Sequence, residues 1–199
     1  TFVVEELDFF KARYESTGGG LNPQNWWGWD TSVPRAQAYT AHGWAIAEAA
    51  EVRTMLYSSI QPRSADATVT WDISWNGQLA AAVGADASAL ATVTVRVYEI
   101  FPGTDTAAIG PTVFETVVES DGVGAALQGL AFVRMEGSDQ RSVVLPPLDP
   151  AKFYRLEAEL ECSSRVAAAI GLTECQFGRD GEGLTIRDWS IRFDNVPPT

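Results

Sequence analysis

The chain has 199 residues, of which 46% are hydrophobic, and its 14 basic and 26 acidic residues give a net charge of −12. This apolar content excludes a disordered chain, and the acidic field opposes binding to nucleic-acid phosphates. No run of about 18 apolar residues is present to form a membrane-spanning helix. We therefore expect a folded chain whose partners include neither nucleic acid nor the membrane interior.

The N-terminal third gives the least distinct pattern. Residues 1–14 fit either a helix or a strand, because their apolar residues satisfy both periods. Residues 36–58 contain helix-forming Ala and Glu but also alternate in polarity, and we favour strand because they lead into clear strand sequence. The Gly- and Trp-rich stretch 18–34 predicts a loop. We expect residues 1–35, the N-terminal segment with its Trp-rich loop, to pack on a β-sandwich domain formed by residues 36–199.

Strong strand patterns begin at Ala67. From Ala67 to Trp75, apolar and polar residues alternate strictly, which is typical of a strand with one buried face. Asn76-Gly77 follows, and the segment Gln78–Val83 continues the chain. Asn-Gly between two such runs is the strongest short signal for a two-residue turn, so we predict a β-hairpin here.

The remaining chain repeats the strand pattern without an intervening helical period. We predict strands over residues 91–100, 112–119, 131–135, 142–145, 153–162 and 184–193. In the last of these the apolar phase slips at Arg187-Asp188, which predicts a β-bulge. Strands at this spacing predict an all-β fold, specifically an antiparallel β-sandwich of jelly-roll type.

The chain contains two cysteines, Cys162 and Cys175, in segments that point apolar side chains inward. We expect a disulfide between neighbouring strands, although two buried free thiols also fit the pattern. Two cysteines and the single His42 are too few for a zinc site, and we expect His42 to be structural. A disulfide favours an extracellular or cell-surface location, outside the reducing cytoplasm.

Three tryptophans within four positions distinguish the segment from Asn25 to Asp30. Trp26, Trp27 and Trp29 lie beside the polar Asn25 and Asp30. Aromatic faces stack on sugar rings and polar side chains bind sugar hydroxyls, so the segment suits a carbohydrate platform. Trp also occupies the centres of protein interfaces, and three large rings equally suit a plug at one end of a sandwich. We take these five residues as the candidate ligand-binding or interface residues.

Two groups of acidic residues are further candidates. Glu157, Glu159 and Glu161 alternate along one strand; we expect a solvated face, and paired-carboxylate hydrolysis is the enzyme class that this alternation leaves open. The Gly-rich stretch around Asp180 and Glu182 offers oxygen ligands that calcium accepts, without the spacing of an EF-hand. We name Asp180 and Glu182 as calcium candidates and expect no other cofactor.

The sequence contains no Gly-x-Ser-x-Gly elbow, no phosphate-binding loop and no His-based metal cluster. We therefore expect a non-catalytic extracellular β-sandwich that acts in structural assembly or surface display by associating with copies of itself. The alternative is a carbohydrate-binding module that binds glycan through Trp26, Trp27 and Trp29. A glycoside hydrolase is the third hypothesis.

Overall fold

The structure is a computed structural model that describes residues 1–7, 10–19, 23–30, 32–45, 48–82, 87–101, 108–125, 130–166 and 171–198. These residues form twelve β-strands and no helix, so they include none long and apolar enough to span a membrane. In chain order the strands are β1 Val3–Glu6, β2 Lys11–Gly19, β3 Pro23–Asp30, β4 Arg35–Ala45, β5 Glu48–Ile60, β6 Ala67–Ala82, β7 Ala87–Phe101, β8 Ala108–Ala125, β9 Leu130–Val144, β10 Phe153–Val166, β11 Gly171–Phe177 and β12 Gly183–Phe193.

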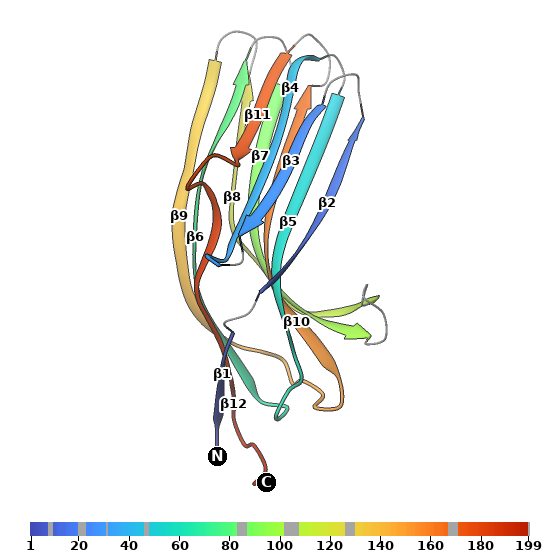
Figure 1. Ribbon diagram of the computed structural model, residues 1–199, viewed down its shortest axis with the longest axis vertical. Helices are drawn as coiled ribbons and strands as arrows, with labels where there is room; N and C mark the ends of the chain where they lie inside the picture. The colour runs from blue at the N-terminus through green and yellow to red at the C-terminus, as the bar shows by residue number, and fades with distance from the viewer. Residues whose placement is uncertain are drawn as a thin grey trace.

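The strands form two antiparallel sheets that pack face to face (Figure 1). In the larger sheet β11 and β12 occupy successive halves of one position between β4 and β6, with β3 outside β4, β9 outside β6 and β1 beside β12. The smaller sheet has the order β2-β5-β10-β7-β8. Across the core, β4, β11/β12, β6 and β9 contact β5, β10, β7 and β8, which is the strand arrangement of a jelly roll. The predicted fold class is confirmed.

The N-terminal segment consists of strands that join both sheets. β1 pairs with β12, β2 with β5 and β3 with β4, all antiparallel. Residues 36–58 contribute β4 and β5, so the favoured prediction of strand is correct; Ile46 lies outside the described residues. The predicted loop over residues 18–34 is wrong for residues 23–30, because β3 pairs with β4 from Pro23 to Asp30 and this pairing satisfies its backbone groups. Residues 18–19 belong to β2 and residues 32–34 form a turn, whereas residues 20–22 and 31 lie outside the described residues.

The predicted hairpin at Asn76-Gly77 is also wrong. β6 runs unbroken from Ala67 to Ala82 and alternates in burial along its whole length. Gly77 belongs to the inward phase, and a Cβ there would lie 2.4 Å from the ring of buried Phe177. The glycine thus serves close packing rather than a turn. Val83, at the end of the predicted hairpin, lies outside the described residues.

Two further predictions about the strands have different outcomes. The short strands predicted over residues 131–135 and 142–145 are the two ends of one strand, β9, which pairs with β6 over residues 130–144. The β-bulge predicted at Arg187-Asp188 is confirmed, because the register of β12 against β6 shifts between Ile186 and Asp188.

The core lies between the sheets and is continuous from β5 and β10 to β6 and β12. On β10, Leu156, Ala158, Leu160 and Cys162 point inward, as their alternation predicts. Each large side chain buried in this way contributes roughly 1.5–3 kcal/mol. The outward faces and the edges of the two sheets are therefore the exposed surfaces of the described strands.

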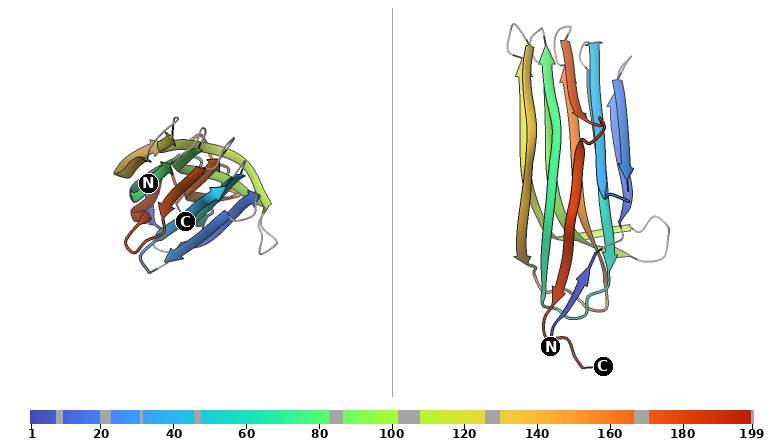
Figure 2. Two further views of the ribbon diagram at one scale, coloured as in Figure 1. Left: turned by 90° about the horizontal axis from the view of Figure 1, so that it is seen from above. Right: turned by 60° about the vertical axis from the view of Figure 1, so that its left-hand side comes forward.

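Both chain termini lie at the same end of the sandwich (Figure 2). The Val196 N–H donates a hydrogen bond to the Thr1 carbonyl (3.1 Å), and the Thr1 hydroxyl donates to the Val196 carbonyl (2.8 Å). Together with the β1–β12 pairing, these bonds hold the two ends together within one chain.

Candidate functional site

Alternation along β3 separates the three tryptophans. Trp26 pairs with Tyr39 of β4 on the outer face of the larger sheet, whereas Trp27 and Trp29 point toward the interior at the edge of the sandwich. Trp26 and Trp29 are 45% and 46% exposed. The three rings therefore do not share one surface, and β3 presents two distinct aromatic surfaces.

The indole of Trp26 lies on two glycines of the outer face. A Cβ added to Gly28 or to Gly178 would lie 2.7 Å from the six-membered ring, and each would meet a different pair of its carbon atoms. Gly28 is on β3, and Gly178 directly follows β11. Because both positions lack a side chain, the ring packs on backbone and its remaining surface faces solvent. A ring fixed in this way loses little conformational freedom when a ligand stacks on it.

Polar side chains from β4 and the end of β11 surround this ring. Together they form a surface hollow of about 430 Å³. The Arg179 guanidinium lies 4.0 Å from a carboxylate oxygen of Glu174, and Arg179 also donates to the amide oxygen of Gln78 (3.1 Å) when that amide is turned toward it. We call this hollow the Trp26 site; its residues are Trp26, Tyr39, Glu174, Gln176, Gly178 and Arg179.

The turn between β11 and β12 forms one wall of the Trp26 site and leaves the plane of the sheet (Figure 1). Gln37 on β4 donates hydrogen bonds to the carbonyls of Arg179 (3.1 Å) and Glu182 (3.0 Å), which fasten the turn to the sheet. Gly181 and Gly183 have φ angles of 79° and 128°, which glycine adopts without steric cost. The glycines around Asp180 therefore shape a turn that carries Arg179 into the site.

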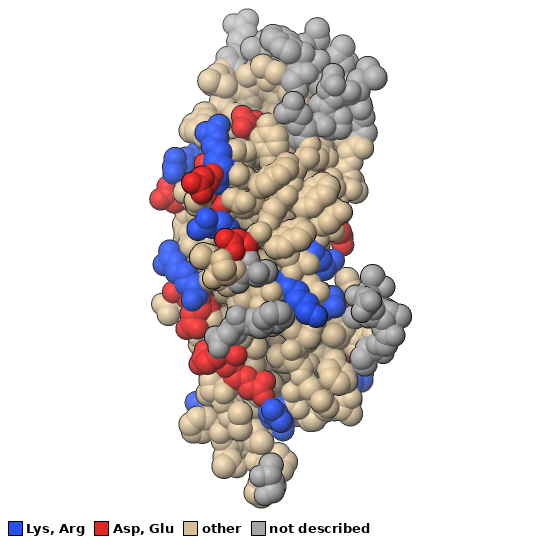
Figure 3. Space-filling model, in the orientation of Figure 1, with Lys and Arg blue, Asp and Glu red and all other residues tan. Residues whose placement is uncertain are grey.

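The charge distribution of this face suits an uncharged ligand. Partial burial and then the negative charge of Glu174 raise the pKa of Tyr39 above its usual value, so its hydroxyl remains a hydrogen-bond donor to a higher pH than that of a free tyrosine. Charged side chains gather on the side of β9, and the area over β3 and β4 is largely uncharged (Figure 3).

The second aromatic surface lies where the edges of the two sheets meet. Tyr14 of β2 stacks on Trp27 with ring centroids 4.0 Å apart and planes 15° apart. Trp29 lies nearly parallel to Tyr14, at 6.4 Å. Trp27 packs against the core, so this stack closes the side of the sandwich while Tyr14 and Trp29 stay exposed.

The polar neighbours of the tryptophans have structural contacts. The Asn25 amide donates to the Ser16 hydroxyl (3.3 Å). One Asp30 oxygen accepts from the backbone N–H (2.9 Å) and the hydroxyl (2.7 Å) of Ser32, and these bonds lower the pKa of Asp30. Their binding of a ligand stays a prediction, and neither belongs to the Trp26 site.

The expected solvated face of Glu157, Glu159 and Glu161 is wrong for the first two, which are buried. Arg13 donates to both oxygens of Glu157, each at 2.9 Å, and Arg96 donates to Glu159 at 2.7 Å. Arg13 extends from β2, across β5, and Arg96 extends from β7 on the other side of β10. The two arginines therefore cover the carboxylates and neutralise their charge. The glutamates are paired within the protein rather than displayed in a cleft.

The calcium candidates and His42 have protein partners nearby. Glu182 accepts a hydrogen bond from the backbone N–H of Arg179 (3.2 Å), within the turn that also contains Asp180. Across the described ranges, no group of three or more His, Cys, Asp or Glu residues is placed to hold a metal ion; calcium binding stays a prediction. His42 is buried, and its Nδ1 lies 3.2 Å from a carboxylate oxygen of Glu48.

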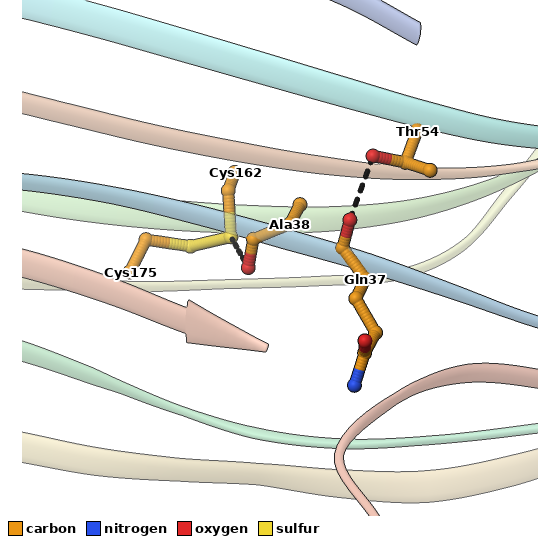
Figure 4. The surroundings of a disulfide bond; sticks show 5 residues. All are labelled: Gln37, Ala38, Thr54, Cys162 and Cys175. Carbon is orange, nitrogen blue, oxygen red and sulfur yellow. Dashed lines mark hydrogen bonds between the residues drawn. A yellow bond between two sulfur atoms is a disulfide. The ribbon is translucent and has the colours of Figure 1, made fainter. Parts of the chain in front are cut away.

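Cys162 and Cys175 form a disulfide, which confirms the predicted bond. The expected link between neighbouring strands is wrong, because Cys162 lies on β10 of the smaller sheet and Cys175 on β11 of the larger one (Figure 4). Their Cα atoms are 5.7 Å apart. Nearby, the Thr54 hydroxyl donates to the Gln37 carbonyl (2.8 Å), so the two layers are linked by a covalent bond and by a hydrogen bond.

The sequence pattern does not point to Tyr39, Glu174, Gln176 and Arg179 as site residues. Tyr39 lies on the next strand of the chain and the other three are far from Trp26 in the sequence, and the pairing of β3 with β4 and of β4 with β11 brings them together. One signal was present, since Tyr39 occupies the opposite phase from His42 in the alternation of residues 36–45. This alternation indicates that Tyr39 and His42 face opposite sides of the strand, but it does not reveal which strands lie beside Tyr39.

No protein-family model and no curated protein sequence matches the chain. Solved structures with some likeness include the enzymatically active domain of tailspike protein 4 from bacteriophage CBA120, with 11% identity over 88% of this chain and 19% of that one, at a TM-score of 0.27. The chain thus spans about a fifth of that tailspike chain.

Two carbohydrate-binding modules are also similar. TmCBM61, solved with β-1,4-galactotriose, shares 7% identity over 88% of both chains at a TM-score of 0.24. The family 11 module from Clostridium thermocellum, solved with a β-1,3-1,4-mixed-linked tetrasaccharide, shares 8% identity over 93% of this chain and 87% of that one, at a TM-score of 0.18. Likenesses at these TM-scores assign neither a family nor a ligand to this chain.

Proposed function

We propose that this protein is a non-catalytic carbohydrate-binding β-sandwich and that the Trp26 site on the outer face of the larger sheet binds the sugar. The observation that carries the proposal is that Trp26 is 45% exposed while its ring lies on Gly28 and Gly178. The C–H face of a pyranose ring stacks on such an aromatic surface. Tyr39 and Gln176 supply hydrogen-bonding groups for its hydroxyls.

The surroundings of the carboxylates support binding without catalysis. Glycoside hydrolysis uses two carboxyl groups roughly 5–9.5 Å apart on either side of the bond that is cleaved. Of the described residues that line the Trp26 site, Glu174 alone carries a carboxylate. Glu157 and Glu159 are buried against arginines, where a substrate has no access to them.

We also propose an extracellular or cell-surface location. The disulfide between Cys162 and Cys175 supports this location, since such bonds persist in oxidising compartments and are reduced in most cytoplasms.

A glycan array followed by calorimetric titration tests the function. The wild-type chain is expected to bind at least one class of uncharged oligosaccharide, and Trp26→Ala to weaken that binding by about tenfold or more, because the stacking surface is removed. Trp29→Ala is the matched control, because Trp29 lies on the same strand with nearly the same exposure but faces the other side. It is expected to bind as the wild type does.

Two results would contradict the proposal. One is a wild-type chain that binds no glycan on the array. The other is the reverse pattern, in which Trp29→Ala abolishes binding and Trp26→Ala leaves it unchanged, since this would move the site to the Tyr14–Trp29 surface.

Self-association is the second candidate function, and the outer strand of the larger sheet favours it. β9 lies at a sheet edge, is 15 residues long and exposes the apolar side chains of Leu130, Phe132 and Val144. A long edge strand can pair with the same strand of another copy. Sedimentation analysis over a wide concentration range tests this candidate, and a monomer throughout would exclude it.

A further inference from the structure

A second hollow adjoins the Trp26 site on the same face of the larger sheet. Its volume is about 340 Å³, near the lower end of the roughly 300–1,000 Å³ range of small-ligand pockets. Alanines form its floor because Ala41 and Ala80 flank Glu174, while Ala82 separates Leu172 from Leu130. We call it the alanine hollow; the residues used here are Tyr39, Ala41, Ala80, Ala82, Leu130, Leu172 and Glu174.

The alanine hollow and the Trp26 site are contiguous. Tyr39 and Glu174 line both of them, and they project from the neighbouring strands β4 and β11. A ligand that stacks on Trp26 and continues beyond one ring therefore passes between these two side chains into the alanine hollow.

The lining of the alanine hollow specifies the chemical group that fits there. Its floor and far wall are aliphatic, so they suit a methyl group. At the rim, the Glu174 carboxylate can accept a hydrogen bond from an amide N–H, and the Tyr39 hydroxyl can donate one to an amide carbonyl. An acetamido group carries all three features, whereas a uronic acid or a sulfated sugar would place its charge beside Glu174.

Resting on the proposed glycan binding, we infer that the alanine hollow receives the acetamido group of an N-acetylhexosamine. The ligand is then an uncharged oligosaccharide of at least two residues. One residue stacks on Trp26, and its N-acetylated neighbour places its methyl group over Ala41, Ala80 and Ala82.

Calorimetric titration of the full chain with matched sugar pairs tests the inference. Chitotriose is compared with cellotriose and N-acetyllactosamine with lactose, because the members of each pair differ by acetamido groups in place of hydroxyls. In at least one pair, the N-acetylated sugar is expected to bind about tenfold more tightly, from one buried methyl group and the amide hydrogen bonds.

Two variants locate the source of this preference. Ala80→Leu fills the hollow from its floor and is expected to abolish the preference, so that the two members of each pair bind with equal affinity. Thr68→Leu is the matched control, since it adds a leucine to the same face of β6 at the far end of the strand, and it is expected to keep the preference.

The outcomes separate this inference from the proposed function. Binding without a preference for N-acetylated sugars, or a preference that survives Ala80→Leu, overturns the inference and leaves glycan binding intact. A wild-type chain that binds no glycan overturns both. A concentration-dependent dimer that Ala80→Leu disrupts would show that a second copy covers the hollow, and it would also overturn the inference.

Discussion

At the residue scale, glycines shape both the core and the candidate site, because their lack of a side chain lets an aromatic ring pack on the backbone. Gly77 makes room for the ring of Phe177 inside the sandwich, and Gly28 and Gly178 support the ring of Trp26 outside it. None of these three glycines has a positive φ. Their role is therefore close approach between backbone and an aromatic ring, rather than an unusual backbone conformation.

Gly178→Ala is expected to weaken glycan binding about tenfold and to leave stability nearly unchanged. The new Cβ would lie 2.7 Å from the Trp26 ring, so this exposed ring must tilt away from the sugar, at a stability cost within about 0.5 kcal/mol. Titration calorimetry and thermal melting measure the two effects. Gly124→Ala is the control, because the nearest atom to its Cβ is 3.9 Å away. An unchanged glycan affinity in Gly178→Ala would contradict the role of Gly178 in positioning the Trp26 ring.

The raised pKa of Tyr98 predicts that the folded state loses stability at alkaline pH. Burial and then the charge of Glu157 raise its pKa from 10.0 to about 12, so the folded state favours the protonated phenol. This contribution is complete below about pH 10 and is lost as the pH rises from about 10 to 12, for a total of about 3 kcal/mol. Urea unfolding at pH 8 and pH 11.5 measures the loss. The free energy of unfolding of Tyr98→Phe should depend less on pH. An equal loss between pH 8 and pH 11.5 in both proteins would refute the assignment of this loss to Tyr98.

At the scale of elements, the edge strand β2 is held by more than its ladder with β5. Arg13 extends over β5 and binds both oxygens of Glu157 on β10. Tyr98 of β7 donates to the same carboxylate (2.7 Å). The outer face of the smaller sheet therefore contains a polar network that connects β2, β10 and β7 and passes over β5.

Glu157→Ala is expected to destabilise the fold by roughly 3–5 kcal/mol, because it leaves the half-buried Arg13 guanidinium without its partner. Urea unfolding measures the change. Glu136→Ala breaks an exposed ion pair of the same 2.9 Å length, with Arg134, and should cost at most about 1 kcal/mol. Similar losses in the two variants would show that burial does not set the strength of the Arg13–Glu157 pair.

At the scale of the whole molecule, the two layers are joined by the core, by the disulfide and by the hydrogen bond from Thr54 of β5 to Gln37 of β4. Cys162 and Cys175 are 13 residues apart in sequence, yet they belong to opposite sheets. The bond therefore closes the connection by which the chain crosses from β10 to β11, and it does so inside the core.

Replacing both cysteines by alanine is expected to lower the free energy of unfolding by about 3 kcal/mol, which is the chain-entropy value for a loop of this length. Equilibrium urea unfolding of the double variant Cys162→Ala/Cys175→Ala measures the change, with circular dichroism to confirm that the β-sheet content is retained. A loss below about 1 kcal/mol would indicate that the core alone fixes the layers.

The sequence by itself determined the features that depend on neighbouring residues along the chain. Period-two alternation and turn residues predicted the all-β jelly-roll class, the inward face of β10, the bulge at Arg187-Asp188 and the pair of cysteines that bond. These features are local because alternation assigns each side chain to one of two faces.

Only the tertiary structure decided which residues pack against each face of a strand. Asn76-Gly77 lies within a strand because Phe177, about a hundred positions later, fills the space above Gly77. Glu157 and Glu159 are buried because Arg13 and Arg96 cover them. Trp26 lies beside Tyr39 because β3 pairs with β4. Alternation carries no information about strand order or register, which long-range packing sets, and the Trp26 site depends on both.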